Sequence, residues 1–470
     1  MKKLFNKIKI SNWPLVFLLL VLNIVFFLFL VTEKYLITII IFTLILFLSF
    51  KVKIPKFPLI LFFLSLLTKI LVILIINPQV ESDFLTMYNA SKLLRVGDLS
   101  YTKLDYFIKW GYQVGNVFYQ AMLLKIFNSI FFLKLVSCLA LSGTTVLIYL
   151  IVKELLNDTS AKFASLSYMF YLQPVLLTTV LTNQHVPTLL FFTAFYIIIK
   201  KDCLATKPII KHLISGLLIG LGNIMRPEGI IFILTIIIYL ICICYKTENI
   251  KSLLLKIMVL VISYTLITKG CSLIFQATGI SKNGLANKDP LWKFVLGTNY
   301  ESQGRYSDND VIYLSDSKKE LEIIKQRTIN NLPKFSKLLA IKAKVFWTGN
   351  DLYWSNDYLE KEDITILSHN ISGKKVNEYC NFINEQVYII TFMLSLVGLY
   401  SLIKTKYDKR VNLFIILLSI YFTVYLFIEI MNRYTYTPRV AIFILAGFGI
   451  DFLTKNSTIK NLKTKKIKSN

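Results

Sequence analysis

Apolar segments long enough to cross a lipid bilayer recur along almost the whole of this 470-residue chain. Only helices and closed barrels satisfy every backbone polar group inside a bilayer. Hydrophobic residues make up 55% of the sequence, above the share of a soluble domain. A spanning helix needs about 20 largely apolar residues, so the sequence predicts an all-α polytopic membrane protein with about 12 transmembrane helices. The expected spans are Asn12–Val31, Tyr35–Phe50, Pro58–Asn77, Ser129–Val152, Phe163–Val180, Val186–Ile199, Leu213–Met225, Gly229–Tyr245, Leu253–Thr268, Glu385–Ile403, Val411–Ile430 and Val440–Leu453.

The distribution of lysine and arginine predicts the orientation of these helices. The formal net charge is +26, and the positive side chains gather at the ends of alternate spans, as they do in cytoplasmic loops. The opposite loops hold few: Lys34, Arg226, Arg433 and Arg439. We therefore expect a multi-pass protein of the cell membrane with both termini in the cytoplasm. The positive clusters are Lys2, Lys3, Lys7 and Lys9; Lys51, Lys53 and Lys56; Lys200, Lys201, Lys207 and Lys211; Lys246, Lys251 and Lys256; and Lys404, Lys406, Lys409 and Arg410.

A strongly basic chain can bind nucleic acid, and residues 454–470 form a basic cytoplasmic tail. Anionic lipid headgroups explain this tail more simply. The expected partners of the positive charge are therefore membrane lipids, and we expect no nucleic acid.

Two hydrophilic regions interrupt the spans on the outer side. The first outer loop covers residues 80–115, within a transmembrane region of residues 1–268. A large outer loop covers residues 269–381, before the C-terminal transmembrane helices of residues 382–453. Mixed polar and apolar residues predict short amphipathic helices in the outer-face loops. These are expected within Glu81–Lys109, in Asn116–Asn128, in Ser317–Leu332 and after Pro333.

Gly216 and Gly220 are spaced for close helix packing. Small residues four positions apart let the backbones of neighbouring membrane helices approach closely. A phosphate-binding loop would need a following Gly-Lys-Ser/Thr run, which the sequence lacks. The sequence also lacks a serine-hydrolase elbow, a zinc-ligand cluster and a dinucleotide-binding fingerprint.

Asp83 is the candidate catalytic residue. Together with Glu81 it follows the span Pro58–Asn77 at the expected outer edge of the membrane. A carboxylate at this depth can act as a general base on a hydroxyl group, or it can hold a divalent cation against a phosphate. The alternative is a solvated acid that only ends the span. Apart from a divalent cation at Asp83, the sequence indicates no cofactor.

The junction Arg226-Pro227-Glu228-Gly229 is a second candidate element, at the outer end of a glycine-rich span. The guanidinium of Arg226 is suited to bidentate contact with a phosphate. Glu228 could instead hold Arg226 in an ion pair. A tight turn with interfacial charges is the purely structural interpretation.

A third element is the turn before the last span, where Arg433 and Tyr434 lie close to Glu429, Asn432 and Tyr436. Positive residues on the outer side run against the usual charge bias of membrane proteins. This pattern favours binding of an anionic lipid headgroup over aromatic anchoring in the membrane interface.

Together these elements resemble the membrane-embedded glycosyltransferases of the GT-C superfamily. In particular, the chain resembles the bacterial branch that looks like protein O-mannosyltransferases and the aminoarabinose transferase of lipid A. The pieces that carry the resemblance are Asp83, Gly111–Gly115 leading into Lys125-Ile126-Phe127, the Arg226–Gly229 junction, the stretch from Leu291-Trp292-Lys293 to Asn299-Tyr300-Glu301, and Asn432-Arg433-Tyr434.

The resemblance implies inverting transfer of a sugar from a polyprenyl-phosphate donor on the outer face of the membrane. The implied acceptor is a cell-envelope glycopolymer, lipid or protein. Asp83 would be the base or the cation ligand on the acceptor side, and Arg226 and Arg433 would lie near the donor phosphate. The other implied substrate-binding residues are Glu81, Glu228, Lys293, Glu301 and Tyr434.

Two other functions fit a large membrane bundle with polar outer residues. A transporter or flippase of lipid-linked sugars would tend to show two similar halves with broken helices at matching positions, and no such repeat is visible. A polysaccharide polymerase would share the outer loop and the arginines but has no stated need for Asp83.

We predict that residues 269–381 lie outside the cell. A cysteine introduced as Ser315→Cys should react with a membrane-impermeant thiol reagent on intact cells, because the lysine bias places this loop on the outer side. Labelling that occurs only after the cells are opened would overturn the orientation.

Overall fold

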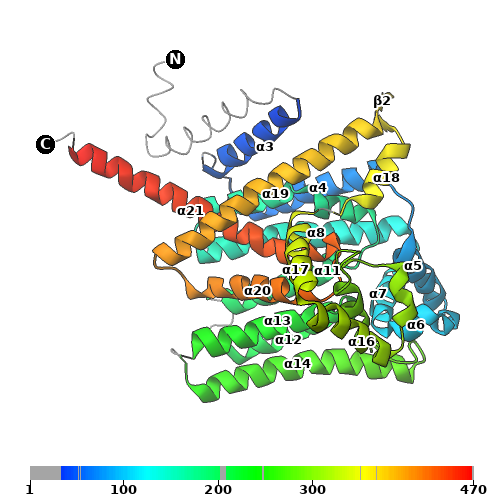
Figure 1. Cartoon of the computed structure of the whole chain (residues 1–470). Coiled ribbons are helices and arrows are strands. Elements are labelled where there is room, and N and C mark those ends of the chain that lie inside the picture. Colours follow the sequence, from blue (N-terminus) through cyan, green and yellow to red (C-terminus); the bar gives the residue numbers. More distant parts are fainter. Residues whose placement is uncertain are drawn as a thin grey trace.

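The computed structural model describes residues 33–467 except residues 51, 53, 202–207, 246–247, 350 and 367. In this part of the chain the long helices run side by side, with their axes across the view of Figure 1. Among the described residues, seven helices are long and apolar enough to cross a membrane, so the chain is a multi-pass membrane protein. They are α4 (Phe57–Ile75), α8 (Ile130–Leu155), α12 (Pro208–Met225), α14 (Ile250–Ala277), α19 (Gly373–Lys404), α20 (Asn412–Phe427) and α21 (Tyr436–Ile467).

Three further apolar helices in the described part of the chain are shorter: α3 (Glu33–Phe50), α11 (His185–Ile199) and α13 (Gly229–Tyr239). The described strands are β1 (Ile364–Ile366) and β2 (His369–Ile371), which pair in an antiparallel hairpin. The prediction of a helical membrane protein is confirmed. The expected span Asn12–Val31 lies outside the described residues, and the count of twelve stays a prediction.

The expected span Phe163–Val180 is wrong as a single helix. The chain forms α9 (Asp158–Met169), α10 (Leu172–Leu176) and the 3₁₀ turn η4 (Leu177–Thr179) instead. Pro174 fits the first turn of a new helix but would break the interior of a continuous one. The amide of Gln173 donates to Asn384 Oδ1 at 2.7 Å, which satisfies one backbone group that the break leaves free. Irregular backbone at membrane depth is tolerated where protein surrounds it in this way.

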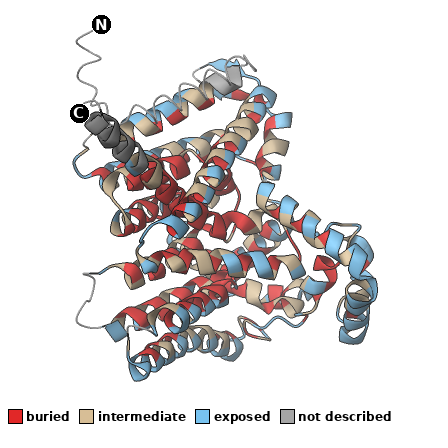
Figure 2. Cartoon of the chain, turned by 60° about the vertical axis from the view of Figure 1, so that its left-hand side comes forward, coloured by how far each residue is buried: buried red, intermediate tan, exposed pale blue. Residues whose placement is uncertain are grey.

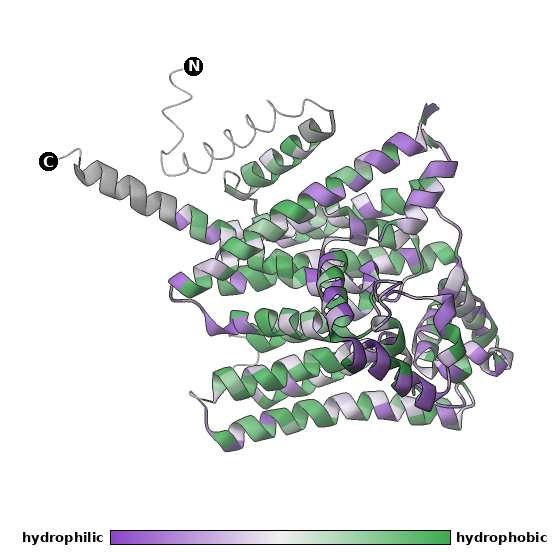
Figure 3. Ribbon diagram, in the orientation of Figure 1, coloured by the Kyte–Doolittle hydropathy of each residue, from purple (hydrophilic) through white to green (hydrophobic). Residues whose placement is uncertain are grey.

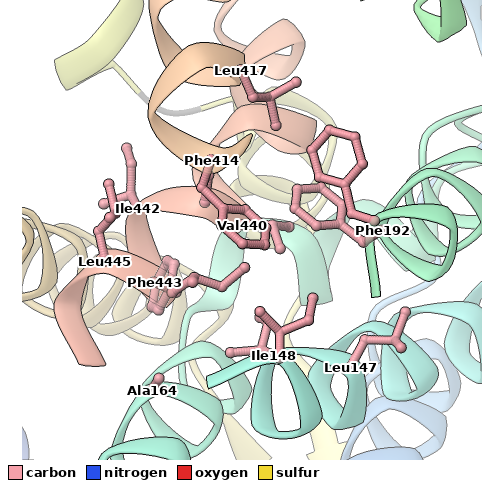
Figure 4. Close-up of a cluster of buried hydrophobic side chains, with 14 of the residues drawn as sticks. Leu147, Ile148, Ala164, Phe192, Phe414, Leu417, Val440, Ile442, Phe443 and Leu445 are labelled. Carbon is pink, nitrogen blue, oxygen red and sulfur yellow. The ribbon is translucent and has the colours of Figure 1, made fainter. Parts of the chain in front are cut away.

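The core lies where α8, α9, α11, α20 and α21 meet. Phe192, Phe414, Val440 and Phe443 are all fully buried there (Figure 4). Buried residues are concentrated in the middle of the bundle (Figure 2). In the most apolar 18-residue stretch of α21, 83% of the residues are buried, whereas 22% are buried in the corresponding stretches of α4 and α14. The bundle therefore forms around α21, and α4 and α14 present apolar side chains on its outside.

Short helices gather at one end of the bundle. They are α5 (Ser82–Arg95), α6 (Asp105–Lys109), α7 (Val114–Ile126), α15 (Trp292–Gly297), α16 (Ser317–Arg327), α17 (Leu332–Thr348) and α18 (Tyr353–Lys361). Figure 1 shows α5, α6, α7 and α18 at the right-hand ends of the long helices, and Figure 3 shows that α16 is strongly hydrophilic. Short helices in both predicted outer loops are thus observed. The helices that flank the large loop extend further than expected, because α14 ends only at Ala277 and α19 begins at Gly373.

The glycines of α12 pack directly against α14. A Cβ atom on Gly216 would lie 1.9 Å from Ser263 Oγ and 2.5 Å from the carbonyl oxygen of Leu260, and one on Gly220 would lie 2.8 Å from Cβ of Ile267. The packing role predicted from their spacing is confirmed.

We expect Gly216→Ala to lower the thermal stability of the purified protein, because the added methyl group forces two backbones apart. Overpacking of this kind typically costs about 1–3 kcal/mol. The matched control is Gly270→Ala in α14, where a Cβ would meet nothing within 4 Å. Equal unfolding temperatures for the two variants would contradict this account of the α12–α14 contact.

Candidate active site

Asp83 lies in the first turn of α5, at the end of the bundle where the short helices gather. Ser82, directly before it, has a φ of 55°. A non-glycine residue in this left-handed region is strained, and such residues are concentrated at functional sites. Desolvation raises the pKa of Asp83, while the positive charges of Arg433 and Lys293 act in the opposite direction. Two cations from distant parts of the sequence therefore lie within electrostatic range of this carboxylate.

Lys293 joins α15 to the segment between α20 and η9 (Asn432–Thr435). Its Nζ atom donates to Glu429 Oε2, and the backbone amide of Glu429 donates to the carbonyl oxygen of Lys293 at 2.7 Å. The hydroxyl of Tyr434 also donates to Glu429 Oε2, at 3.3 Å. Burial lowers the pKa of Lys293, but the neighbouring Tyr434 and Glu429 outweigh this and raise it overall. Lys293 is therefore a charged group at neutral pH.

Arg226 forms a buried ion pair with Glu228. Its Nε atom donates to Glu228 Oε1 at 2.5 Å, and its Nη1 atom donates to Asn183 Oδ1 at 3.0 Å. The hydroxyl of Tyr421 donates to Glu228 Oε2 at 2.8 Å. Of the alternatives left open by the sequence, the structure shows the ion pair.

The ring of Tyr434 lies close to three cations. Arg226 Cζ is 5.5 Å from its centroid, Lys293 Nζ is 5.8 Å away and Arg433 Cζ is 5.9 Å away. These distances fall within the range of cation–π attraction. Tyr434 therefore brings the junction after α12, the start of α15 and η9 into one cluster.

Arg433 is held by aromatic rings. Its Cζ atom lies 5.2 Å from the centroid of Phe84 and 5.3 Å from that of Trp354 in α18. Its backbone amide donates to Asp351 Oδ2 at 3.2 Å. Within the described residues, no oxygen accepts a hydrogen bond from its guanidinium. The donors of Arg433 thus remain available to a ligand beside Asp83.

Residues 115–268 match the family model described as dolichyl-phosphate-mannose-protein mannosyltransferase. This part of the chain is similar to that family. The matched region contains the Arg226–Glu228 pair and Asn183. The resemblance to membrane glycosyltransferases inferred from the sequence is thereby confirmed.

A comparison with solved structures also found matches. The oligosaccharyltransferase AglB from Archaeoglobus fulgidus, in complex with an inhibitory peptide and a dolichol-phosphate, is 13% identical with a TM-score of 0.48. That match covers 87% of this chain and 52% of the other, so the chain spans about half the length of that protein. ArnT from Cupriavidus metallidurans bound to undecaprenyl phosphate is 12% identical with a TM-score of 0.39, covering 86% of this chain and 78% of the other. No curated protein sequence matches the chain.

Two of the predicted substrate-binding residues lie apart from the cluster around Tyr434. Glu81 is exposed and lies within electrostatic range of Lys361. The side chain of Glu301 is 78% exposed and pairs with Lys334 at 2.7 Å. It lines a cavity of about 240 Å³ between α15, α16 and α17. The structure therefore groups Asp83 with Arg226, Glu228, Lys293, Arg433 and Tyr434, but not with Glu81 or Glu301.

Three residues of the cluster were not predicted from the sequence. Desolvation raises the pKa of Asp351. The positive charge of Arg433 and a hydrogen bond from the backbone amide of Arg433 act to lower this pKa. Desolvation also raises the pKa of Tyr106 and that of Tyr112, the latter to about 12, and the charge of Asp83 adds to both shifts. Tyr112 lies inside the Gly111–Gly115 motif, which was a usable signal. No sequence signal pointed to Asp351, because it lies far along the chain from Asp83, in an irregular segment.

The residues around Asp83 do not make a strong metal site. No group of three or more His, Cys, Asp or Glu side chains suited to a metal ion occurs in the described part of the chain. The charged groups that act most strongly on Asp83 are the cations Arg433 and Lys293.

Arg226 and Arg433 should respond differently to replacement by lysine. Arg226→Lys loses two directed hydrogen bonds to buried partners, so we expect a clearly lower unfolding temperature. Removing one partner of a buried ion pair costs about 3–5 kcal/mol. The loss for lysine should be smaller than this, because lysine keeps the positive charge beside Glu228. Arg433→Lys keeps the charge beside the rings and should unfold close to the wild type. If Arg433→Lys is the less stable protein, the guanidinium of Arg433 has a structural role.

Proposed function

We propose that this chain is a glycosyltransferase that moves a sugar from a polyprenyl-phosphate donor to a cell-envelope acceptor. The observation that carries the proposal is the placement of Asp83 beside Arg433 and Lys293 at the end of a membrane bundle whose residues 115–268 match a mannosyltransferase family. The acceptor would be a glycopolymer, a lipid or a protein of the cell envelope. Both termini would be cytoplasmic and the site extracytoplasmic, as the lysine distribution predicts.

In this proposal the donor phosphate lies against Arg433 and Lys293. Breaking the bond between the sugar and the phosphate leaves negative charge on the phosphate oxygens. Fixed cations at that position stabilise the charge as it develops. Arg433 offers a planar set of donors that suits bidentate contact with phosphate, and no oxygen in the described residues occupies them. Lys293 adds a positive charge held in place by Glu429.

Arg226 supports this site indirectly. The sequence suggested direct contact with the phosphate, but two of its three guanidinium nitrogens are bonded to Glu228 and Asn183. Its side chain packs against the ring of Tyr434, which also touches Lys293 and Arg433. We infer that Arg226 and Glu228 fix the position of Tyr434 and through it the two phosphate-binding cations.

Asp83 would accept the proton of the acceptor hydroxyl group. A general base works best when its pKa approaches the working pH. Desolvation raises the pKa of Asp83 above its ordinary value and so moves it in the useful direction. The expected pH dependence is that of a general base. Turnover is lost as the pH falls through the pKa of Asp83, because the protonated carboxyl group cannot accept a proton.

We expect Asp83→Asn to abolish most of the transfer activity while leaving abundance and membrane insertion unchanged. Asparagine is nearly isosteric with aspartate but lacks the negative charge, and a general base typically contributes about 10²–10⁴-fold. The measurement is transfer of a radiolabelled sugar from a synthetic polyprenyl-phosphate donor into envelope material. In the wild type the rate should also fall on the acid side, and that fall should be absent from the residual rate of Asp83→Asn.

Glu81→Gln is the matched control, since Glu81 is a carboxylate two positions away that lies outside the cluster. A normal rate in Asp83→Asn, or a loss of activity only in Glu81→Gln, would show that Asp83 is not the base. A wild-type protein that moves the lipid-linked sugar across vesicle membranes without transferring it would instead support the transporter function.

A further inference from the structure

Lys342 is a buried cation of the large outer loop. It lies in α17, it is 1% exposed, and no carboxylate of the described chain forms an ion pair with it. Its Nζ atom donates instead to two backbone carbonyl oxygens, those of Gly297 and Ile428, each at 2.8 Å. Removing an ammonium group from water is costly, and bonds to neutral carbonyl groups offset only part of this cost. Packing alone therefore does not explain a lysine at this position.

The carbonyl group of Ile428 and the amide of Glu429 belong to the same peptide bond. The carbonyl end of this peptide accepts from Lys342, and its amide end donates to the carbonyl oxygen of Lys293 at 2.7 Å. Because a peptide group is planar, bonds at both of its ends fix its orientation. Lys342 therefore fixes the backbone from which the side chain of Glu429 reaches Lys293 Nζ.

Helix α15 is held at both ends by these contacts. Lys293, in its first turn, bonds to Glu429 through the backbone and through the side chain. Gly297, at its last position, accepts from Lys342 through its carbonyl oxygen. A Cβ atom on Gly297 would collide with the backbone at the end of α20, so the two helix ends are in direct contact. One ammonium group thus joins α17, the end of α15 and the end of α20.

The loop that follows α15 packs against the stem of Lys342. A Cβ atom on Gly304 would lie 2.8 Å from both Cδ and Cε of Lys342. Gly304 also has a φ of 79°, in the left-handed region that favours glycine. Its carbonyl oxygen accepts from the amide of Ile430 at 2.8 Å, which ties the loop to the same segment after α20. The side chain of Lys342 is therefore confined along its length, with its ammonium group directed at the two carbonyl oxygens.

We propose that Lys342 is a positioning residue that holds Lys293 in place for the donor phosphate. The inference rests on the proposed function, in which Lys293 contacts that phosphate. Lys342 acts through the peptide before Glu429 and through the end of α15, and it need not touch the substrate. An ammonium group makes charge-assisted hydrogen bonds, which are about twice as strong as neutral ones. A side chain without donors would leave both contacts unmade and allow α15 to shift.

The first test measures the donor requirement of Lys342→Met in the full-length protein. Methionine is nearly as long as lysine but donates no hydrogen bond. We expect the KM for a synthetic polyprenyl-phosphate sugar to rise by about tenfold or more with little change in kcat, because a displaced cation binds the phosphate less well before and during transfer. A purely structural loss would instead lower the amount of active protein, and hence the apparent kcat, at an unchanged KM.

Lys344→Met is the matched control for this measurement. Lys344 lies two positions further along α17 and is exposed, so the variant removes the same charge from the same helix without touching α15. It should keep the KM of the wild type. If Lys342→Met does not fold, Lys342→Gln takes its place, because its amide keeps a donor but lacks the charge.

A double variant tests the path through Lys293. Lys293→Met alone should raise the KM for the donor, and adding Lys342→Met should raise it little further, because both changes act on one cation. Effects that multiply in the double variant would show that Lys342 acts independently of Lys293 and would overturn the proposal.

Binding of farnesyl phosphate separates this inference from the proposed function, because it needs no sugar transfer. We expect Lys342→Met to bind this probe about tenfold more weakly than the wild type. Equal binding would overturn the role of Lys342 and leave the transferase proposal intact. A wild type that binds the probe but transfers no sugar would refute the transferase, while weaker binding by Lys342→Met would still support the positioning role. A wild type that does not bind the probe would overturn both.

Discussion

The site depends on the buried guanidinium of Arg439, which ties α21 to two other segments of the chain. Its Nη1 atom donates to the hydroxyl of Tyr171 and, at 2.5 Å, to Gln173 Oε1 in the broken stretch after α9. Its Nη2 atom donates to the carbonyl oxygens of Trp347 at 3.1 Å and Gly349 at 2.5 Å, where α17 ends. Without it the carbonyl oxygens of Trp347 and Gly349 would lose this donor, and a lost hydrogen bond is costly for a buried group in a bundle surrounded by lipid. Because η9 directly precedes α21, the same residue sets the position of the cluster around Tyr434.

Most charges of the cluster are balanced in pairs. Arg226 is paired with Glu228, and Lys293 with Glu429, and both acids are buried. Arg433 differs, because rings surround its guanidinium and no carboxylate in the described chain is bonded to it. The guanidinium of Arg433 therefore has a positive charge that no protein carboxylate neutralises. In a partly desolvated site, this charge attracts a negatively charged group more strongly than it attracts water.

A residue of the site could be predicted only where the neighbouring sequence already marked it as unusual. Arg226 and Arg433 stood out because positive residues on the outer side oppose the charge bias, and both lie in the cluster. Asp351 did not, since its nearness to Arg433 arises only from tertiary structure. The same limit applies to the fold. Hydropathy predicted most spans but not the break at Pro174, which is stabilised by an asparagine some two hundred positions later in the chain.

The ring of Tyr434, shared by three cations, has a thermodynamic consequence. Residues that touch a common partner do not contribute independently to stability or affinity, and coupling energies between them are about 0.5–3 kcal/mol. The Arg226–Glu228 pair and the Lys293–Glu429 pair both contact this one ring. Changes in the two pairs should therefore be non-additive, and replacing the ring by a small side chain should make them additive. Evolution of ligand preference in such a cluster would proceed through correlated substitutions in segments far apart in the sequence.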